Sequence, residues 1–292
     1  MSNEIVLEKG NLYGTWHRAR NRAIEMSDTI HSDEVAQKVG FRGGAVVGIS
    51  HLDLFPPLLI EAFGQRWFER GSISIYYTYA LTDGEQLRAV VAAPAAGAED
   101  AQVEAWLETP EGKTVGRGTA SIGSPKQPSY LMSQELVNAK REDVRILADM
   151  KAGDPMPTED VLITQEGLLE RVDAIHDPLD WYTGDSPWGG PILHPSAYYG
   201  AMSMGGPDHN YTEGAKAVSF FGATELRNVN GPIKVGVPYR SGGEFTCVGT
   251  SPKTEFFWFD SYLDEKDSGK RVAEMRHLSR IMKASSALWQ EG

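Results

Sequence analysis

The chain has 292 residues, 28 of them Lys or Arg and 40 Asp or Glu, and its formal net charge of −12 at pH 7 argues against a nucleic-acid partner or an anionic membrane surface. Cys247 is the only cysteine, which excludes an internal disulfide and a paired-thiol zinc motif and favours a cytoplasmic location. The length is sufficient for two domains, each with a core of its own.

The N-terminal segment MSNEIVLEKG has no basic start and no apolar core, so we expect no secretion signal. The segment 45–63 is largely apolar, but His51, Asp53 and a Pro-Pro pair interrupt it, and we expect it not to span a bilayer. Because it is too long for one strand, we predict a buried central helix there. We predict a second central helix in PILHPSAYYGAMSM, at 191–204.

Strand-like runs follow each central segment. They cover 71–80, 85–93, 101–109 and 114–122 in the first half, and 217–226, 233–240, 243–250, 255–264 and 271–282 in the second. Turn signals such as Asp83-Gly84 separate the runs, as the hairpins of an antiparallel sheet require. The aromatic runs IYYTYA and EFFWFDSY are interpreted as sheet faces. One helix with an antiparallel sheet, made twice, is an α+β plan.

The boundary between the halves is predicted near residues 127–157. The proline-rich PKQPSY leads into the stretch 133–150, whose apolar residues have helical spacing, and KAGDPMPTED follows as a loop. We therefore predict an N-terminal domain at 1–126, a linker with a helix at 127–157, and a C-terminal domain at 158–292.

A short motif supports duplication of a whole domain. EMSDTIH at 25–31 recurs as ERVDAIH at 170–176, and a Gly-Gly pair follows each copy, beginning at Gly43 and at Gly189. The period is far too long for a solenoid repeat, so we interpret the chain as two related halves. The repeated Asp and His indicate either an acid–base pair or a local hydrogen bond that fixes a turn.

The first copy and its continuation, HSDEVAQKVGFRGGAVVG at 31–48, is similar to the signature of MaoC-like (R)-specific enoyl-thioester hydratases. The element order resembles the hotdog fold, in which a sheet wraps a central helix. The resemblance implies a tandem, or double, hotdog protein whose halves pair through their sheet edges as a pseudo-dimer within the chain. A homodimer of the whole chain is a further expectation.

Position by position, the resemblance implies a catalytic role for His31 and His176 and an oxyanion-binding backbone N–H at Gly48. The second copy keeps the family's neighbouring His as His194, but Pro195 occupies the glycine position and has no N–H to donate. The family's catalytic Asp is absent from both copies, where Met26 and Arg171 stand instead. The nearest carboxylates belong to Asp28 and Glu25 in the first copy, and to Asp173 and Glu170 in the second.

We expect the first half to be the active one, with His31 as general acid or base, Asp28 as its orienting carboxylate and Gly48 as oxyanion donor. His176 and Asp173 are the corresponding candidates of the second half. Candidate substrate contacts are Glu25, His51, His194, Tyr198 and Tyr199. The alternative for Glu25 is a solvated or ion-paired side chain. The alternative for His51 is a residue of the core.

These residues predict a cofactor-independent lyase of the hydratase/dehydratase type that acts on a carbonyl-containing small molecule. The substrate would be an acyl thioester of CoA or a carrier protein, or an aromatic or natural-product intermediate. A hotdog thioesterase and a non-catalytic protein that binds an apolar ligand are the alternatives. The seven His residues have no HxH or HExxH spacing, and the chain has no Gly-rich phosphate loop, so we predict no metal or nucleotide cofactor.

Overall fold

The computed structural model describes residues 4–26, 28–173, 175, 177–203 and 217–290. The first half contributes the strands β1 (Val6–Glu8), β2 (Asn11–Tyr13), β3 (His17–Arg18), β4 (Gly71–Tyr77), β5 (Gln86–Ala92), β6 (Ala101–Glu108) and β7 (Thr114–Ile122). The second half contributes β8 (Pro155–Leu162), β9 (Ser219–Asn228), β10 (Pro238–Thr250), β11 (Thr254–Glu265) and β12 (Arg271–Met282).

The helices are short. The α-helices are α1 (Asp33–Lys38), α2 (Pro56–Phe63), α3 (Trp67–Arg70), α4 (Gln165–Val172) and α5 (Tyr198–Met202). The 3₁₀ helices are η1 (Gly48–Leu54), η2 (Arg141–Asp143), η3 (Asp180–Tyr182), η4 (Pro195–Ala197), η5 (Lys283–Ser285) and η6 (Ala287–Trp289). In the described part of the chain, none of them is long and apolar enough to cross a bilayer.

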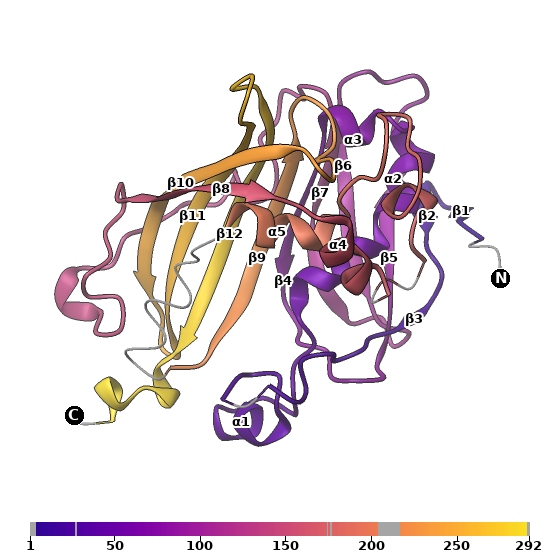
Figure 1. Ribbon diagram of the computed structural model, residues 1–292. Helices are drawn as coiled ribbons and strands as arrows, with labels where there is room; N and C mark the ends of the chain where they lie inside the picture. Colours follow the sequence, from indigo (N-terminus) through magenta and orange to yellow (C-terminus); the bar gives the residue numbers. More distant parts are fainter. Residues whose placement is uncertain (1–3, 27, 174, 176, 204–216, 291–292) are drawn as a thin grey trace.

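The strands of both halves form one antiparallel sheet. Its order is β1-β2-β5-β6-β7-β4-β9-β12-β11-β10-β8, with β3 paired to β5 (Figure 1). The run β2-β5-β6-β7-β4 of the first half corresponds to β8-β10-β11-β12-β9 of the second, so the duplication seen in the sequence is present in the topology. The halves meet where β4 pairs with β9, from Ser72 opposite Arg227 to Tyr76 opposite Ala223. The predicted pairing of sheet edges within the chain is confirmed.

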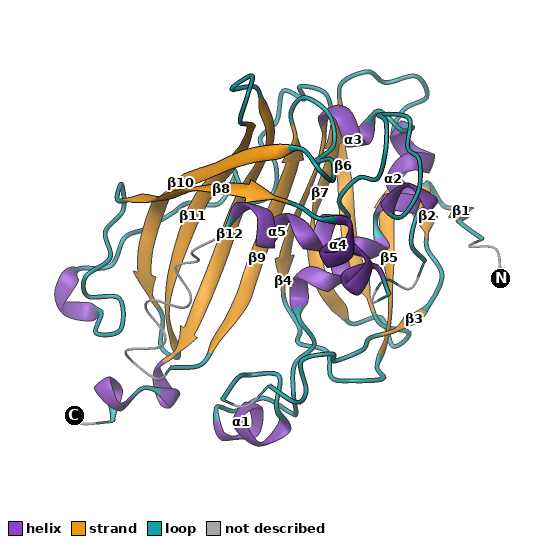
Figure 2. Ribbon diagram, viewed as in Figure 1, coloured by secondary structure: helices purple, strands orange, loops and turns teal. Residues whose placement is uncertain are grey.

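Helices of each half lie against this sheet (Figure 2). α2 contacts β5, while α5 contacts β11 and β12. The first predicted central helix is divided into η1 and α2, because Pro56 cannot donate the hydrogen bond of a helix interior and stands instead at the start of α2. In the second half, η4 and α5 occupy the corresponding place. Buried side chains of both halves, among them Leu59 and Phe257, belong to one core cluster.

The predicted helix at 133–150 is wrong. Apart from the three residues of η2, this stretch is irregular, and its backbone is held by Glu255 of β11, which is fully buried. The Glu255 carboxylate accepts hydrogen bonds from the backbone N–H groups of Arg145 (2.7 Å), Ile146 (3.1 Å) and Leu147 (2.8 Å), and from Nε1 of Trp289 (2.7 Å). The carboxylate therefore binds N–H groups that a helix would have used internally.

Two strand predictions also differ from the structure. The segment 151–160 was expected to be a loop, but β8 begins at Pro155; only Met156 and Val161 of β8 are buried, and their spacing of five positions gives no alternating pattern. Residues 233–237 were expected to be a strand, but β10 begins at Pro238. Gly236 has φ +77° there, a left-handed conformation that interrupts an extended strand.

Candidate active site

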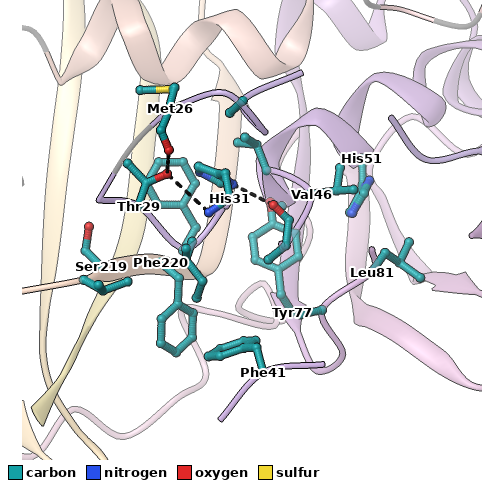
Figure 3. A pocket seen from close by; sticks show the side chains of 18 of the residues that line it. Met26, Thr29, His31, Phe41, Val46, His51, Tyr77, Leu81, Ser219 and Phe220 are labelled. Carbon is teal, nitrogen blue, oxygen red and sulfur yellow. Dashed lines mark hydrogen bonds between the residues drawn. The ribbon is translucent and has the colours of Figure 1, made fainter. Parts of the chain in front are cut away.

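A cavity of about 1210 Å³ lies between the two halves. The first half lines it with residues of the segments 23–31, 41–51 and 77–81, and the second half with residues of 199–203 and 217–221. Of the candidate residues, Asp28, His31, Gly48, His51 and Tyr199 line this cavity. Figure 3 shows His31 and His51 among the lining side chains. The tertiary structure therefore brings together five candidate residues from three separate segments of the sequence.

His31 has a defined tautomer in this cavity. Its Nδ1 lies 2.6 Å from the carbonyl oxygen of Ala45 (Figure 3). Because a carbonyl oxygen can only accept, Nδ1 carries the proton, and the lone pair of the neutral imidazole is on Nε2. The backbone N–H of His31 donates to Oγ1 of Thr29 at 3.3 Å, which fixes the residue further. In the neutral form of His31 the acceptor nitrogen is therefore Nε2.

The Gly-Gly pair of the first copy permits this orientation. The backbone N–H of Gly44 donates to Oδ1 of Asp33 at 2.7 Å, and the next N–H, of Ala45, donates to the carbonyl of Ile30 at 2.9 Å. A Cβ atom on Gly44 would stand 2.1 Å from the carbonyl oxygen of His31, so no side chain fits there. In the second copy Gly189 and Gly190 have φ +80° and +77° and serve a turn instead.

We expect Gly44→Ala to lower both stability and any activity that depends on His31. The Cβ contact is with backbone, which cannot rotate away, and overpacking of this kind costs about 1–3 kcal/mol. Gly43→Ala is the matched control, because its Cβ would meet the carboxylate oxygen of Asp33 at 3.0 Å and a methyl of Thr82 at 3.4 Å, both on side chains. Thermal unfolding of the two variants makes the comparison, and equal melting temperatures would contradict the expectation.

Asp28 lies at the cavity without orienting His31. The contact predicted between the two side chains is taken by the carbonyl of Ala45, to which His31 donates. Asp28 is exposed and has φ +60°, a left-handed conformation that is uncommon for residues other than glycine. Such conformations are often found at functional sites, where the surrounding structure maintains them. Its carboxylate is therefore placed as a separate group beside the cavity.

The other candidates from the repeated motif lie elsewhere. Glu25 and Asp173 are exposed and are not among the described residues that line the cavity. The carbonyl oxygen of Asp173 accepts a hydrogen bond from the guanidinium of Arg22, three positions before the first motif. His176 lies outside the described residues.

His194 and Tyr198 are buried in polar contacts, that of His194 with the first half and that of Tyr198 within the second, and do not belong to the described lining of the cavity. Nδ1 of His194 lies 3.2 Å from Oδ1 of Asp53, on η1, and the same oxygen accepts from the backbone N–H of Ser196 at 2.8 Å. The hydroxyl of Tyr198 donates to Asn228 on β9 at 2.8 Å. Asp53 was not among the sequence candidates, although a carboxylate within the apolar run HLDLF was a signal of a buried partner.

Tyr77 of β4 was also missed, because its aromatic strand was interpreted only as a sheet face. Its ring lines the cavity, and a Cβ atom on Gly48 would stand 3.3 Å from that ring. Burial raises the pKa of the Tyr77 phenol well above its usual value, so the hydroxyl stays protonated. Because residue 48 is a glycine, its backbone can lie close to the ring of Tyr77.

His51 and His277 are buried imidazoles that the protein holds neutral. Burial lowers the pKa of His51 to about 4, although the nearby carboxylate of Asp53 acts in the opposite direction. Burial also lowers the pKa of His277, on β12, to about 3. Nδ1 of His277 and Oγ1 of Thr224 share a hydrogen bond of 3.0 Å. In both residues burial removes the water that would solvate the charged imidazolium, so the neutral form is favoured.

These two residues predict a loss of stability in acid. In the unfolded chain each His binds a proton below pH about 6.5. In the folded protein His51 stays unprotonated until about pH 4 and His277 until about pH 3. The free energy of unfolding should therefore fall as pH decreases from about 6.5, by on the order of 3 kcal/mol for each residue. Thermal unfolding at pH 7, 5 and 4 measures the effect. The double variant His51→Gln/His277→Gln should show a shallower pH dependence, and an unchanged slope would contradict the assignment.

No protein-family model matches this sequence, and no curated protein matches it either. Solved structures do match. A MaoC domain dehydratase, described as putative, from Chloroflexus aurantiacus J-10-fl is 10% identical, with a TM-score of 0.60 over 92% of this chain and 93% of that one. A conserved hypothetical protein from Mycobacterium tuberculosis, described as having a double hotdog fold, is 11% identical, with a TM-score of 0.57 over 97% of each chain.

A further structure, described as a MaoC-like dehydratase, is 14% identical to this chain, with a TM-score of 0.52 over 91% of this chain and 97% of that one. The matches extend over nearly the whole of both partners in each comparison. They confirm the predicted α+β tandem hotdog fold.

Proposed function

We propose that this protein is a cofactor-independent lyase of the hydratase/dehydratase type, acting on a small molecule with a conjugated carbonyl. The observation that supports this most is His31, whose Nδ1 proton is held by Ala45 while the residue lines a cavity of about 1210 Å³. A neutral imidazole with its lone pair on Nε2 can take a proton from water and return it, which addition and elimination both require.

The chemistry can be written with the residues of this cavity. Nε2 of His31 takes a proton from water as the water oxygen bonds to the carbon β to the carbonyl. The electron pair of the carbon–carbon double bond moves toward the carbonyl oxygen and forms an enolate. The carbon α to the carbonyl then takes a proton from the imidazolium, which returns His31 to its neutral form. Elimination of water is the same sequence in reverse, and no oxidant or reductant is consumed.

The developing enolate needs a hydrogen-bond donor. Gly48 is the first residue of η1 and lines the cavity, and the first N–H groups of a helix have no acceptor within that helix. The N–H of Gly48 is therefore the proposed oxyanion donor. The second half would shape the other side of the cavity through Tyr199 and its neighbours.

The test uses substrates whose conjugation is lost on hydration. Crotonyl-CoA, cinnamoyl-CoA and the neutral enone chalcone are incubated with the protein, and ultraviolet absorbance, product mass and free thiol are recorded. Loss of absorbance with addition of one water to the product mass is the expected result for at least one of them. Release of thiol without loss of conjugation would indicate a thioesterase instead, and binding without turnover of any compound would indicate a binding protein.

A further inference from the structure

The cavity contains a second imidazole, His51, separate from His31. His51 of η1 lines the cavity and is only 5% exposed, and its closest charged neighbour along the helix is Asp53. Figure 3 shows His31 and His51 at separate positions, with Val46 drawn between them. Because His51 lines the cavity, its ring nitrogens can hydrogen-bond to a ligand bound there, and such a bond adds affinity.

The surroundings of His51 favour an uncharged partner. The imidazole is neutral, since burial lowers its pKa to about 4, and it offers one N–H donor and one acceptor nitrogen. The carboxylate of Asp53, two residues further along η1, is 7% exposed and would repel an anionic group brought beside it. A hydroxyl or a ketone oxygen meets both conditions, whereas a carboxylate does not.

The remaining surface of the cavity suits a ring-bearing molecule. Phe41 and Phe220 pack edge to face with centroids 5.4 Å apart, and Tyr199 and Phe221 pack tilted at 4.6 Å. All four of these residues line the cavity, and they come from both halves of the chain. We call them the aromatic wall. Aromatic side chains arranged in this way pack well against the faces and edges of other rings.

We propose that the cavity accepts an uncharged, ring-bearing carbonyl compound with a second oxygen function, a hydroxyl or a ketone, that hydrogen-bonds to His51. The rings would pack on the aromatic wall, and the reacting carbonyl would face His31 and Gly48. The proposal rests on the proposed function only for the end of the molecule that reacts. It makes His51 a specificity-determining residue and places the substrate outside the class of anionic acids.

Equilibrium dialysis with four chalcones tests this assignment. The probes are chalcone, 4-hydroxychalcone, 4′-hydroxychalcone and 4-carboxychalcone, which share one ring system. We expect the wild-type protein to bind at least one hydroxychalcone about fivefold more tightly than chalcone, as one neutral hydrogen bond allows, and 4-carboxychalcone most weakly. In His51→Leu the hydroxyl preference should disappear, and in His51→Gln, which keeps a donor and an acceptor, it should persist in part.

Several outcomes would overturn the inference: no hydroxyl preference in wild type, tightest binding of the carboxylate, or an unchanged preference in His51→Leu. If His51→Leu does not fold, the comparison of wild type with His51→Gln decides, because a preference of equal size in both would contradict a role for the imidazole. Turnover in the same samples separates the two proposals. Binding with the expected preference but no turnover contradicts the proposed function alone, while turnover without the preference contradicts the inference alone.

Discussion

Replacement of His31 by Ala is expected to lower kcat/KM for a conjugated carbonyl substrate by about two to four orders of magnitude, the range usual for loss of a general acid–base group. The substitution removes Nε2, the group assigned to proton transfer. It also removes the 2.6 Å hydrogen bond to Ala45. The loss should appear mainly in kcat, since the aromatic wall and His51 still bind the substrate.

The measurement is steady-state kinetics on whichever compound wild type converts, with circular dichroism to verify the fold. His17→Gln is the control, because His17 lies 3.1 Å from Asp177 and is not among the described residues of the cavity lining. Added imidazole should restore part of the activity of His31→Ala. A folded His31→Ala variant with wild-type kcat would remove His31 from the mechanism.

Replacement of Glu255 by Ala is expected to destabilise the protein by on the order of 3–5 kcal/mol, the cost of leaving several buried N–H donors without an acceptor. The carboxylate is fully buried and accepts four hydrogen bonds, three from the linker backbone at 145–147 and one from Trp289. Without it, these donors are left without their acceptor. The linker and the C-terminal helix η6 should both loosen from β11.

Denaturant and thermal unfolding measure the change. Glu255→Gln keeps one acceptor oxygen and should lie between wild type and Glu255→Ala. Glu244, an exposed residue of β10, provides the control, and Glu244→Ala should stay within about 0.5 kcal/mol of wild type. If Glu255→Ala unfolds at the wild-type temperature, the linker is held by other contacts.

The sequence by itself determined the features that depend on local pattern. Strands such as β4 to β7 were predicted near their observed bounds, because alternation of side chains and turn residues act over a few positions. The repeated motif disclosed the duplication, and the resemblance of its first copy to a known signature pointed to His31 and Gly48, which line one cavity.

Only the tertiary structure decided which distant groups meet. Asp53 reaches His194 across the boundary between the halves, and Phe220 joins His31 in one cavity although they belong to different halves. The predicted linker helix failed for the same reason, since its N–H groups are bonded by Glu255, more than one hundred positions away. The helix propensity of the linker is a weak preference, and the buried carboxylate that β11 supplies as an acceptor outweighs it.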